Sequence, residues 1–387
     1  MPDVRFSRQG RGAAFLLVLA GLLTACLEQE PARERTRHLA VAEQITLGLA
    51  WPLDHPKRTL VEGAELAVGE INADGGVLGR PLTLQLRDDE RSVDEAMRIA
   101  ESFAADPRLS AVIAHLDSSL ALAAAPAYEQ AELPMLTPGA TDVHLTERGY
   151  QWVFRTMVNN AHSGRQLADR LVSQGHERVV VYYLNNSFGR DLARQFESRA
   201  AERGLEVVDR RGYDGVGSNH ARRFRDWRDF LAFDAIVIAG SLPEGAAIIR
   251  QIRALGVDVP IHGGIGLDSP ALVRLGGDAV GGVQVTTVFH PDMPGERVAE
   301  FVAAYEEKTG QRPDAAAAQG YDAVYLLAAA MERAESVQPA AIAKALRAPM
   351  GYSGVSGLYR FDPHGELIDK PVIFQQVAEG SLQYLTH

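Results

Sequence analysis

Short apolar segments alternate with helical segments along most of this chain, and this alternation constrains its fold more than any other feature. In the first half, strands are predicted at residues 45–50, 82–86 and 111–114, with helices between them at residues 60–71 and 93–105. Such an alternation is typical of parallel sheets that are covered by helices on both faces. The sequence therefore predicts an α/β protein built on doubly wound sheets.

A second strand–helix series begins near residue 156. Its predicted strands lie at residues 178–184, 206–210, 235–239, 259–262 and 283–289, with helices at residues 162–174, 190–204, 221–232 and 245–255. Three further helices (295–309, 316–333, 340–346) and two late strands (357–362, 372–377) follow. A chain of 387 residues that is 46% hydrophobic can fill two cores. We therefore expect two α/β halves, with the chain passing between them.

The first 26 residues differ from the rest of the chain and are typical of an export signal. A basic region (residues 5–11) precedes an apolar segment (residues 13–23) that is too short to span a bilayer. Small residues then precede Cys26, as in a lipoprotein signal; a plain signal peptide or an anchor helix is the alternative. Cys26 is the only cysteine, so it has no partner for an internal disulfide. The sequence predicts that residues 1–25 are removed and that lipidated Cys26 anchors a periplasmic body in the bacterial cell envelope.

The charge and the polarity of the next segment add two expectations. The whole chain has a formal net charge of −11, and because residues 1–25 carry +2, the remainder carries −13. An acidic surface of this size argues against nucleic acid as a partner and against electrostatic adhesion to anionic lipid. Residues 26–43 are polar and show no apolar pattern, so we expect a flexible tether before a folded body that begins at residue 44.

Polar turns follow two neighbouring predicted strands. Asp117-Ser118-Ser119 comes after the strand at residues 111–114, and Thr137 to Asp142 comes after a short strand at residues 133–136. The carboxyl ends of neighbouring parallel strands face one crevice, where helix N-termini and hydroxyl groups bind anions. The alternative is that Ser118 and Thr141 are ordinary N-caps. The pattern of the turns leaves both interpretations open.

Several short segments occur in an order that resembles a known family. They are spread over residues 44–378; no single segment is specific, but their order and spacing agree. The chain resembles the type I periplasmic binding proteins, in particular the leucine/isoleucine/valine-binding branch of the ABC transporter substrate-binding proteins. The segments that carry this resemblance are Glu62 to Asn72 with Gly75-Gly76, Asp88-Asp89, Pro134 to Thr141, Ser187 to Asp191, Gly320 to Val324, and Gly354 to Gly357 with Phe361-Asp362.

The resemblance implies a two-lobed fold with a three-stranded hinge, in which each lobe holds a doubly wound, mostly parallel sheet. Such proteins capture a small molecule between the lobes and deliver it to ABC permease subunits, without catalysis, cofactor or metal. We expect the protein to be a monomer. The sequence contains no catalytic or phosphate-binding motif in a suitable context. A ligand-sensing or envelope-scaffolding lipoprotein with the same fold is the alternative. The expected N-terminal lobe is 44–156 plus 289–359 and the C-terminal lobe 157–288 plus 360–387, with crossings near Thr156, Val288 and Arg360.

The resemblance places the ligand's carboxylate against the polar turns of the first lobe. Ser118 and Thr141 match the serine and threonine that hold this carboxylate in the family, and Ser119 is an additional candidate. The other groups expected beside the ligand in this lobe are those of Leu116, Asp117, Gly139 and Ala140.

The facing lobe departs from the family. Phe188 stands where amino-acid-binding members have a tyrosine, so the aromatic wall remains without its hydroxyl. Ile265 stands where they have the glutamate that binds the ligand's ammonium group, and a buried ammonium without an acidic partner is costly. An amino acid would then need Asp268 or Asp117 as that partner. The resemblance therefore favours a carboxylate or amide with an apolar or aromatic body.

Three smaller expectations concern loops and histidines. Trp51, in a shortened loop after the first strand, is either a surface on which the ligand stacks or a packing residue at the rim. Arg91 and Asp117 match the positions of a disulfide in some family members, and we expect a salt bridge between them. The histidines show no metal-ligand spacing, so we expect them at the surface or in loops.

Overall fold

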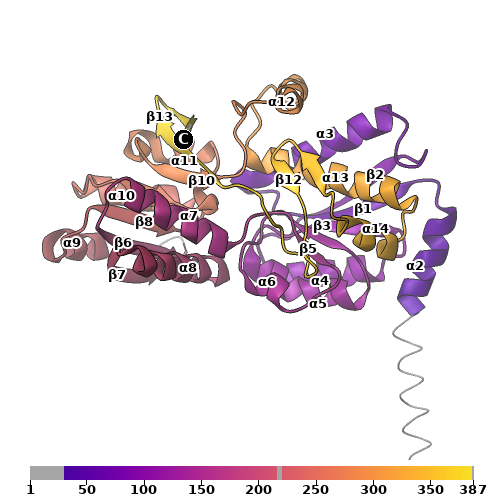
Figure 1. Ribbon diagram of the computed structural model, residues 1–387, viewed down its shortest axis with the longest axis horizontal. Helices are drawn as coiled ribbons and strands as arrows, with labels where there is room; N and C mark the ends of the chain where they lie inside the picture. The colour runs from indigo at the N-terminus through magenta and orange to yellow at the C-terminus, as the bar shows by residue number, and fades with distance from the viewer. Residues whose placement is uncertain (1–29, 216–219, 386–387) are drawn as a thin grey trace, which may run out of the picture.

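The two predicted series form two lobes that lie side by side (Figure 1). The structure is a computed structural model and describes residues 30–215 and 220–385. Cys26 and the predicted signal peptide lie outside the described residues. Among the described helices, none is long and apolar enough to cross a membrane.

The N-terminal lobe is built on a parallel five-stranded sheet with the order β2-β1-β3-β4-β5. Its central strand β3 is buried at every residue, as expected of a parallel strand covered on both faces. The strands are β1 (Ile45–Ala50), β2 (Leu82–Arg87), β3 (Leu109–Ala114), β4 (Met135–Thr137) and β5 (Val153–Arg155), and a hairpin joins β11 (Tyr352–Gly354) to β12 (Gly357–Tyr359). The helices are η2 (Pro56–Arg58), α3 (Thr59–Ala73), α4 (Val93–Ala105), α5 (Ser118–Gln130), α6 (His144–Glu147), α12 (Glu296–Thr309), α13 (Ala315–Ala334) and α14 (Pro339–Leu346).

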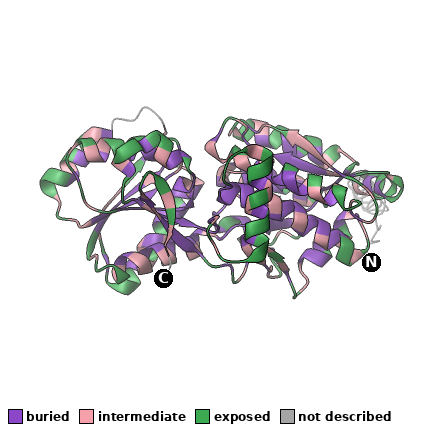
Figure 2. Ribbon diagram, turned by 90° about the horizontal axis from the view of Figure 1, so that it is seen from above, coloured by how far each residue is buried: buried purple, intermediate pink, exposed green. Residues whose placement is uncertain are grey.

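The C-terminal lobe holds a seven-stranded sheet with the order β14-β13-β10-β9-β8-β6-β7, in which β13 and β14 are antiparallel to their neighbours. Figure 2 shows buried strands inside each lobe and helices whose outer faces are exposed. The strands are β6 (Arg178–Leu184), β7 (Glu206–Tyr213), β8 (Ala235–Ala239), β9 (Ile261–Gly263), β10 (Gln284–Thr287), β13 (Ile373–Ala378) and β14 (Ser381–Leu385). The helices are α7 (Asn160–Ser173), α8 (Ser187–Arg203), α9 (His220–Phe230), α10 (Glu244–Ala254), η3 (Ile265–Leu267), α11 (Ala271–Gly276) and η4 (Gly277–Val280).

The third crossing between the lobes comes later than expected. Phe361 and Leu367 pack in the core of the N-terminal lobe, and Glu366 binds the buried Arg155 of β5 at 3.0 Å. Val372 is the first residue after this segment that packs in the other lobe. The prediction that the chain crosses near Arg360 is therefore wrong. The buried Arg155 holds the segment that follows Arg360 against the N-terminal lobe.

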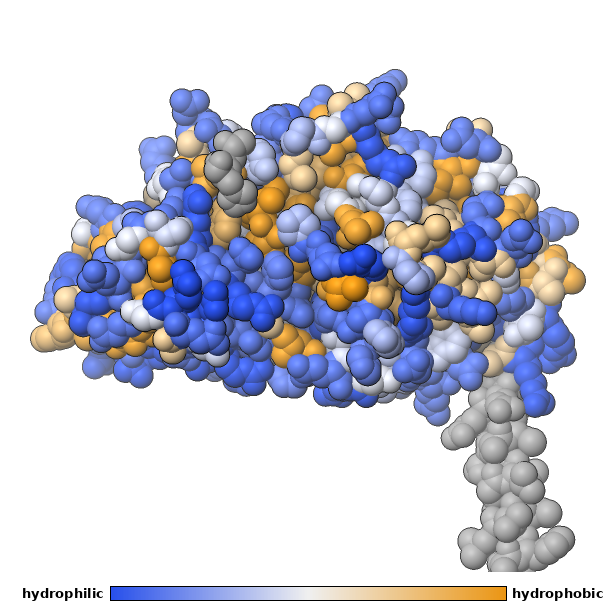
Figure 3. Space-filling view, in the orientation of Figure 1, coloured by the Kyte–Doolittle hydropathy of each residue, from blue (hydrophilic) through white to orange (hydrophobic). Residues whose placement is uncertain are grey.

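On the face in Figure 3, apolar side chains gather near the junction of the lobes, within a mostly hydrophilic surface.

The expected tether is also wrong for most of its length, because residues Glu30–Val41 form helix α2 (Figure 1). Leu39 of this helix packs in the core of the N-terminal lobe. Arg35 is 1% exposed, and its guanidinium donates hydrogen bonds to carbonyl oxygens at the ends of α4 and α5 (Ala104, 2.6 Å; Ala131, 2.8 Å). Helix C-termini carry unpaired carbonyls and partial negative charge, which explains why they hold a cation.

Several histidines are buried, contrary to expectation. A histidine can be buried when its imidazole ring is hydrogen-bonded or uncharged. His115 is fully buried, and its Nδ1 lies 2.8 Å from Asp89 Oδ2. The buried histidines are His55, His115, His220, His262 and His290.

Candidate functional site

The two polar turns after β3 and β4 lie against each other. The hydroxyl oxygen of Ser118 accepts hydrogen bonds from the backbone N–H groups of Thr141 (3.1 Å) and Asp142 (3.2 Å). A Cβ on Gly139 would lie 2.5 Å from the Cα of Leu116, so only glycine permits this approach. The N-cap interpretation is wrong for both hydroxyl residues: Asp117 is the N-cap of α5, and Val143 is that of α6.

The predicted salt bridge between Arg91 and Asp117 is confirmed. Arg91 Nε lies 2.9 Å from Asp117 Oδ2, and both side chains are partly buried. Because Asp117 is turned toward Arg91, it makes no side-chain cap at the start of α5. The first backbone N–H groups of α5 therefore donate no hydrogen bond to the Asp117 side chain. They also have no acceptor inside the helix, because the first N–H groups of any helix lack one.

The loop after β1 reaches across to the C-terminal lobe. Lys57 Nζ donates a hydrogen bond to the carbonyl oxygen of Ile265 at 2.8 Å. His55 Nε2 lies 3.3 Å from the carbonyl oxygen of Leu242. The N-terminal lobe supplies the side chains of both contacts and the C-terminal lobe supplies carbonyl oxygens. The lobes are therefore closed onto each other at this point.

A cavity of about 40 Å³ lies between the turns and the facing lobe. This volume has room for water but not for an organic ligand. Six of the predicted site residues line it: Leu116, Asp117, Ser118, Gly139, Phe188 and Ile265. Its other lining residues, which the sequence analysis missed, are His55, Lys57, Ser241 and Gly266. Two of these residues, His55 and Lys57, could have been noticed in the sequence as a histidine and a lysine just after the first strand.

Five predicted residues lie outside this wall: Trp51, Ser119, Ala140, Thr141 and Asp268. Trp51 is 1% exposed in the core of the N-terminal lobe, and its Nε1 donates to the carbonyl oxygen of Lys57 at 2.9 Å. Trp51 therefore packs and positions the loop instead of offering a face to the cleft. Thr141 is fully buried behind Ser118.

Asp268 lines a separate, larger cavity of about 900 Å³ between the lobes, together with Asp314 and Gln375. The amide of Gln375 donates a hydrogen bond to its carboxylate. Burial raises the pKa of Asp268 to about 7, although the nearby Lys57 opposes this change. Burial disfavours the charged form of a base, and it lowers the pKa of His55 to about 4. Burial also lowers the pKa of Lys57, although the negative charge of Asp268 opposes this change.

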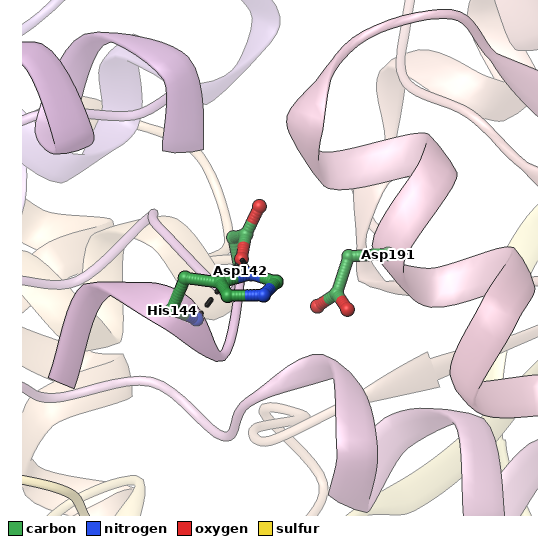
Figure 4. A group of neighbouring side chains, drawn as sticks. All are labelled: Asp142, His144 and Asp191. Carbon is green, nitrogen blue, oxygen red and sulfur yellow. Dashed lines mark hydrogen bonds and ion pairs between the residues drawn. The ribbon is translucent and has the colours of Figure 1, made fainter. Parts of the chain in front are cut away.

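A second contact between the lobes lies beside α6 and α8 (Figure 4). His144 Nδ1 is 2.7 Å from Asp142 Oδ1, and ligating atoms of both residues lie within 4.8 Å of an oxygen of Asp191 from the other lobe. These side chains are of metal-binding types. However, the Asp191 oxygens already accept hydrogen bonds from Val143 N, Asn160, Arg194 and Gln195. The cluster is therefore a contact that joins the lobes.

Two doubly wound lobes, three crossings and a cavity between the lobes define a receptor that closes around a small molecule. The family model described as periplasmic binding protein matches residues 52–381, and the chain belongs to this family.

Two solved structures and one further relative agree with this assignment. A substrate-binding protein of an ABC transporter from Desulfitobacterium hafniense, solved in complex with Leu, is 38% identical, with a TM-score of 0.79; the match covers 89% of this chain and 100% of that one. A leucine-binding protein from Thermotoga maritima is 31% identical, with a TM-score of 0.83 and coverage of 88% and 98%. The Leu/Ile/Val-binding protein homolog 1 of Brucella abortus is 27% identical, covering 83% of this chain and 87% of its own.

The predicted family and two-lobed fold are thus confirmed, and so is the class of function, that of an ABC transporter substrate-binding protein. The relatives are binding proteins of transporters and not enzymes.

Proposed function

We propose that this protein captures a small carboxylate or amide with an apolar or aromatic body and delivers it to the permease subunits of an ABC importer. The observation that carries the ligand class is that the Ser118 turn faces Phe188 and Ile265 across one cavity. The N-terminus of α5 favours an anion through its free N–H groups and the helix dipole. The facing residues offer an apolar surface for the rest of the ligand.

Ligand binding would be coupled to movement of the lobes. The cavity of about 40 Å³ is far smaller than the roughly 300 Å³ of ordinary ligand pockets, so the lobes must separate before a ligand enters. The three crossings provide a hinge for this motion. The leucine held by the Desulfitobacterium relative supports a ligand of similar size that carries a carboxylate.

The proposal also includes a lipid anchor on Cys26 and a monomeric receptor. The signal pattern before Cys26 supports lipidation, with the folded body held in the periplasm by its anchor. A monomer is sufficient, because the cavity is lined by residues of one chain.

A binding experiment tests the proposal. Isothermal titration calorimetry with aliphatic and aromatic carboxylates, amides and amino acids is expected to identify at least one ligand. Ser118→Ala should weaken its binding at least roughly tenfold, since a buried hydrogen bond to a charged group is lost. Ser173→Ala, at an exposed position on α7, is the matched control and should bind normally. If no compound binds the wild-type protein, the proposed ligand class is wrong.

A further inference from the structure

Lys57 is held so that its side chain must project into the cleft. Its carbonyl oxygen accepts from Trp51 Nε1 at 2.9 Å, and its backbone N–H donates to His55 Nδ1 at 3.1 Å. The side chain then crosses to the carbonyl oxygen of Ile265 in the other lobe. The position of this ammonium group is therefore built by the fold.

Lys57 also determines the charge of the small cavity. The other charged group in the wall, Asp117, is already paired with Arg91. His55 is uncharged at neutral pH because burial lowers its pKa to about 4. Within the described chain, no carboxylate oxygen lies within the 4.0 Å ion-pair distance of Lys57 Nζ. Asp268 and Asp314 act on Lys57 from the side of the larger cavity, and Asp117, which is paired with Arg91, acts on it from the small cavity.

A ligand that carries an ammonium group of its own would meet two obstacles here. The carbonyl oxygen of Ile265, an acceptor suited to an ammonium, is occupied by Lys57. The second positive charge would also lie close to the first in a small space shielded from water, where like charges repel strongly. A carboxylate would instead find the N-terminus of α5 and the ammonium of Lys57 in the same wall.

We propose that Lys57 is the specificity-determining residue of the cleft. When the lobes separate, its ammonium leaves Ile265 and pairs with the anionic group of the ligand. The site thereby selects carboxylates without an ammonium group, such as 2-oxo acids and aromatic carboxylates, over the corresponding amino acids. This inference rests on the proposed function, and it names a ligand class that differs from the leucine of the Desulfitobacterium relative.

The test compares ligands that differ only at the amino group. Calorimetric titrations of the purified wild-type protein with 4-methyl-2-oxopentanoate and with leucine give a ratio of affinities, and benzoate provides an aromatic probe. The expected ratio favours the oxo acid by roughly 100-fold. Lys57→Met keeps the length of the side chain without its charge and should reduce the ratio at least tenfold. Lys344→Met, at an exposed position on α14, should leave the ratio unchanged.

The outcomes separate this inference from the proposed function. Leucine binding as tightly as the oxo acid, or an unchanged ratio in Lys57→Met, overturns the role of Lys57 while the receptor function stands. Absence of binding by all probes, in both proteins, counts against the proposed function and this inference together. The wild-type ratio needs no variant, so a folding defect in Lys57→Met would not leave the inference untested.

Discussion

The two walls of the cleft are built in different ways. The wall of the N-terminal lobe consists of two turns fastened by Ser118 and by the close approach of Gly139 to Leu116. The wall of the C-terminal lobe presents the apolar side chains of Phe188 and Ile265 and the carbonyl oxygens that receive His55 and Lys57. One wall is a polar frame that close contacts hold rigid, and the other is a mainly apolar surface. In the proposed function, the first wall binds the ligand's charged end and the second wall contacts its apolar body.

The largest effect is expected from breaking the rigid wall. Gly139→Ala places a Cβ 2.5 Å from backbone atoms of Leu116, so the turns must move apart. Ligand affinity should fall by more than roughly 100-fold, because the frame that positions the anion site is lost. Gly69→Ala is the control, since a Cβ there meets nothing within 4 Å. Calorimetry measures the ligand affinity of both variants, and thermal unfolding measures their stability. Normal affinity in Gly139→Ala would contradict the description of this wall as a rigid frame.

The apolar wall of the C-terminal lobe should respond less. Phe188→Ala removes most of an apolar contact and should weaken binding roughly tenfold. Phe188→Tyr keeps the ring and adds a hydroxyl, so its affinity should remain within a few-fold of the wild-type value. Titration of both variants with the same ligand tests this, and a larger loss in Phe188→Ala than in Gly139→Ala would reverse the ranking of the walls.

One titratable residue in each lobe makes stability depend on pH, with opposite signs. Asp268 has a folded-state pKa raised from 3.8 to about 7, so its contribution to stability is present below pH 4 and is lost as pH rises through 7. His55 has a folded-state pKa lowered from 6.5 to about 4, so its contribution is present above pH 6.5 and is lost as pH falls through 4.

Urea unfolding between pH 4 and 7 can separate the two groups. Relative to wild type, Asp268→Asn should gain unfolding free energy as pH rises, by at most about 1.4 kcal/mol per pH unit. His55→Gln should lose unfolding free energy relative to wild type over the same range. Differences that share one sign would show that at least one of these groups titrates otherwise.

The smallest effect is expected away from the cavity, at the contact between α6 and α8. Asp191→Asn weakens the hydrogen bond from Val143 N across the lobes and the salt bridge to the exposed Arg194. Affinity should fall only about two- to fivefold, because asparagine keeps an oxygen that accepts hydrogen bonds and the ion-pair partner Arg194 is exposed to solvent. Asp169→Asn, in a surface pair on α7, serves as the control. A loss as large as that of Gly139→Ala would place the main closure contact here instead.

Local patterns predicted the sheets well. Strand β1 has the predicted bounds, and α4 occupies the predicted residues 93–105. The contact between the Ser118 and Thr141 turns followed from the parallel order of β3 and β4. These features depend on neighbours in sequence or on the rule that parallel strands end at one edge.

The misplaced features depend on contacts between distant parts of the chain. Arg35 reaches carbonyl oxygens 69 and 96 positions away, and the interaction of Lys57 with Ile265 spans 208 positions. The buried Arg155 selects the path of the segment that carries Glu366. A polar residue in a sequence is usually taken as exposed, and nothing local distinguishes these cations from solvated ones.

If Cys26 carries the proposed lipid, helix α2 limits how far the body can move from the membrane. Only residues 27–29 separate Cys26 from the start of α2 at Glu30. The four residue steps from Cys26 to Glu30 span at most about 14 Å, so a lipid on Cys26 would keep the first turn of α2 near the bilayer surface. Because Arg35 and Leu39 fasten α2 to the N-terminal lobe, the anchor would restrict the tumbling of that lobe. The receptor would then search for its permease in two dimensions, with the N-terminal lobe held toward the bilayer and the other lobe free to swing.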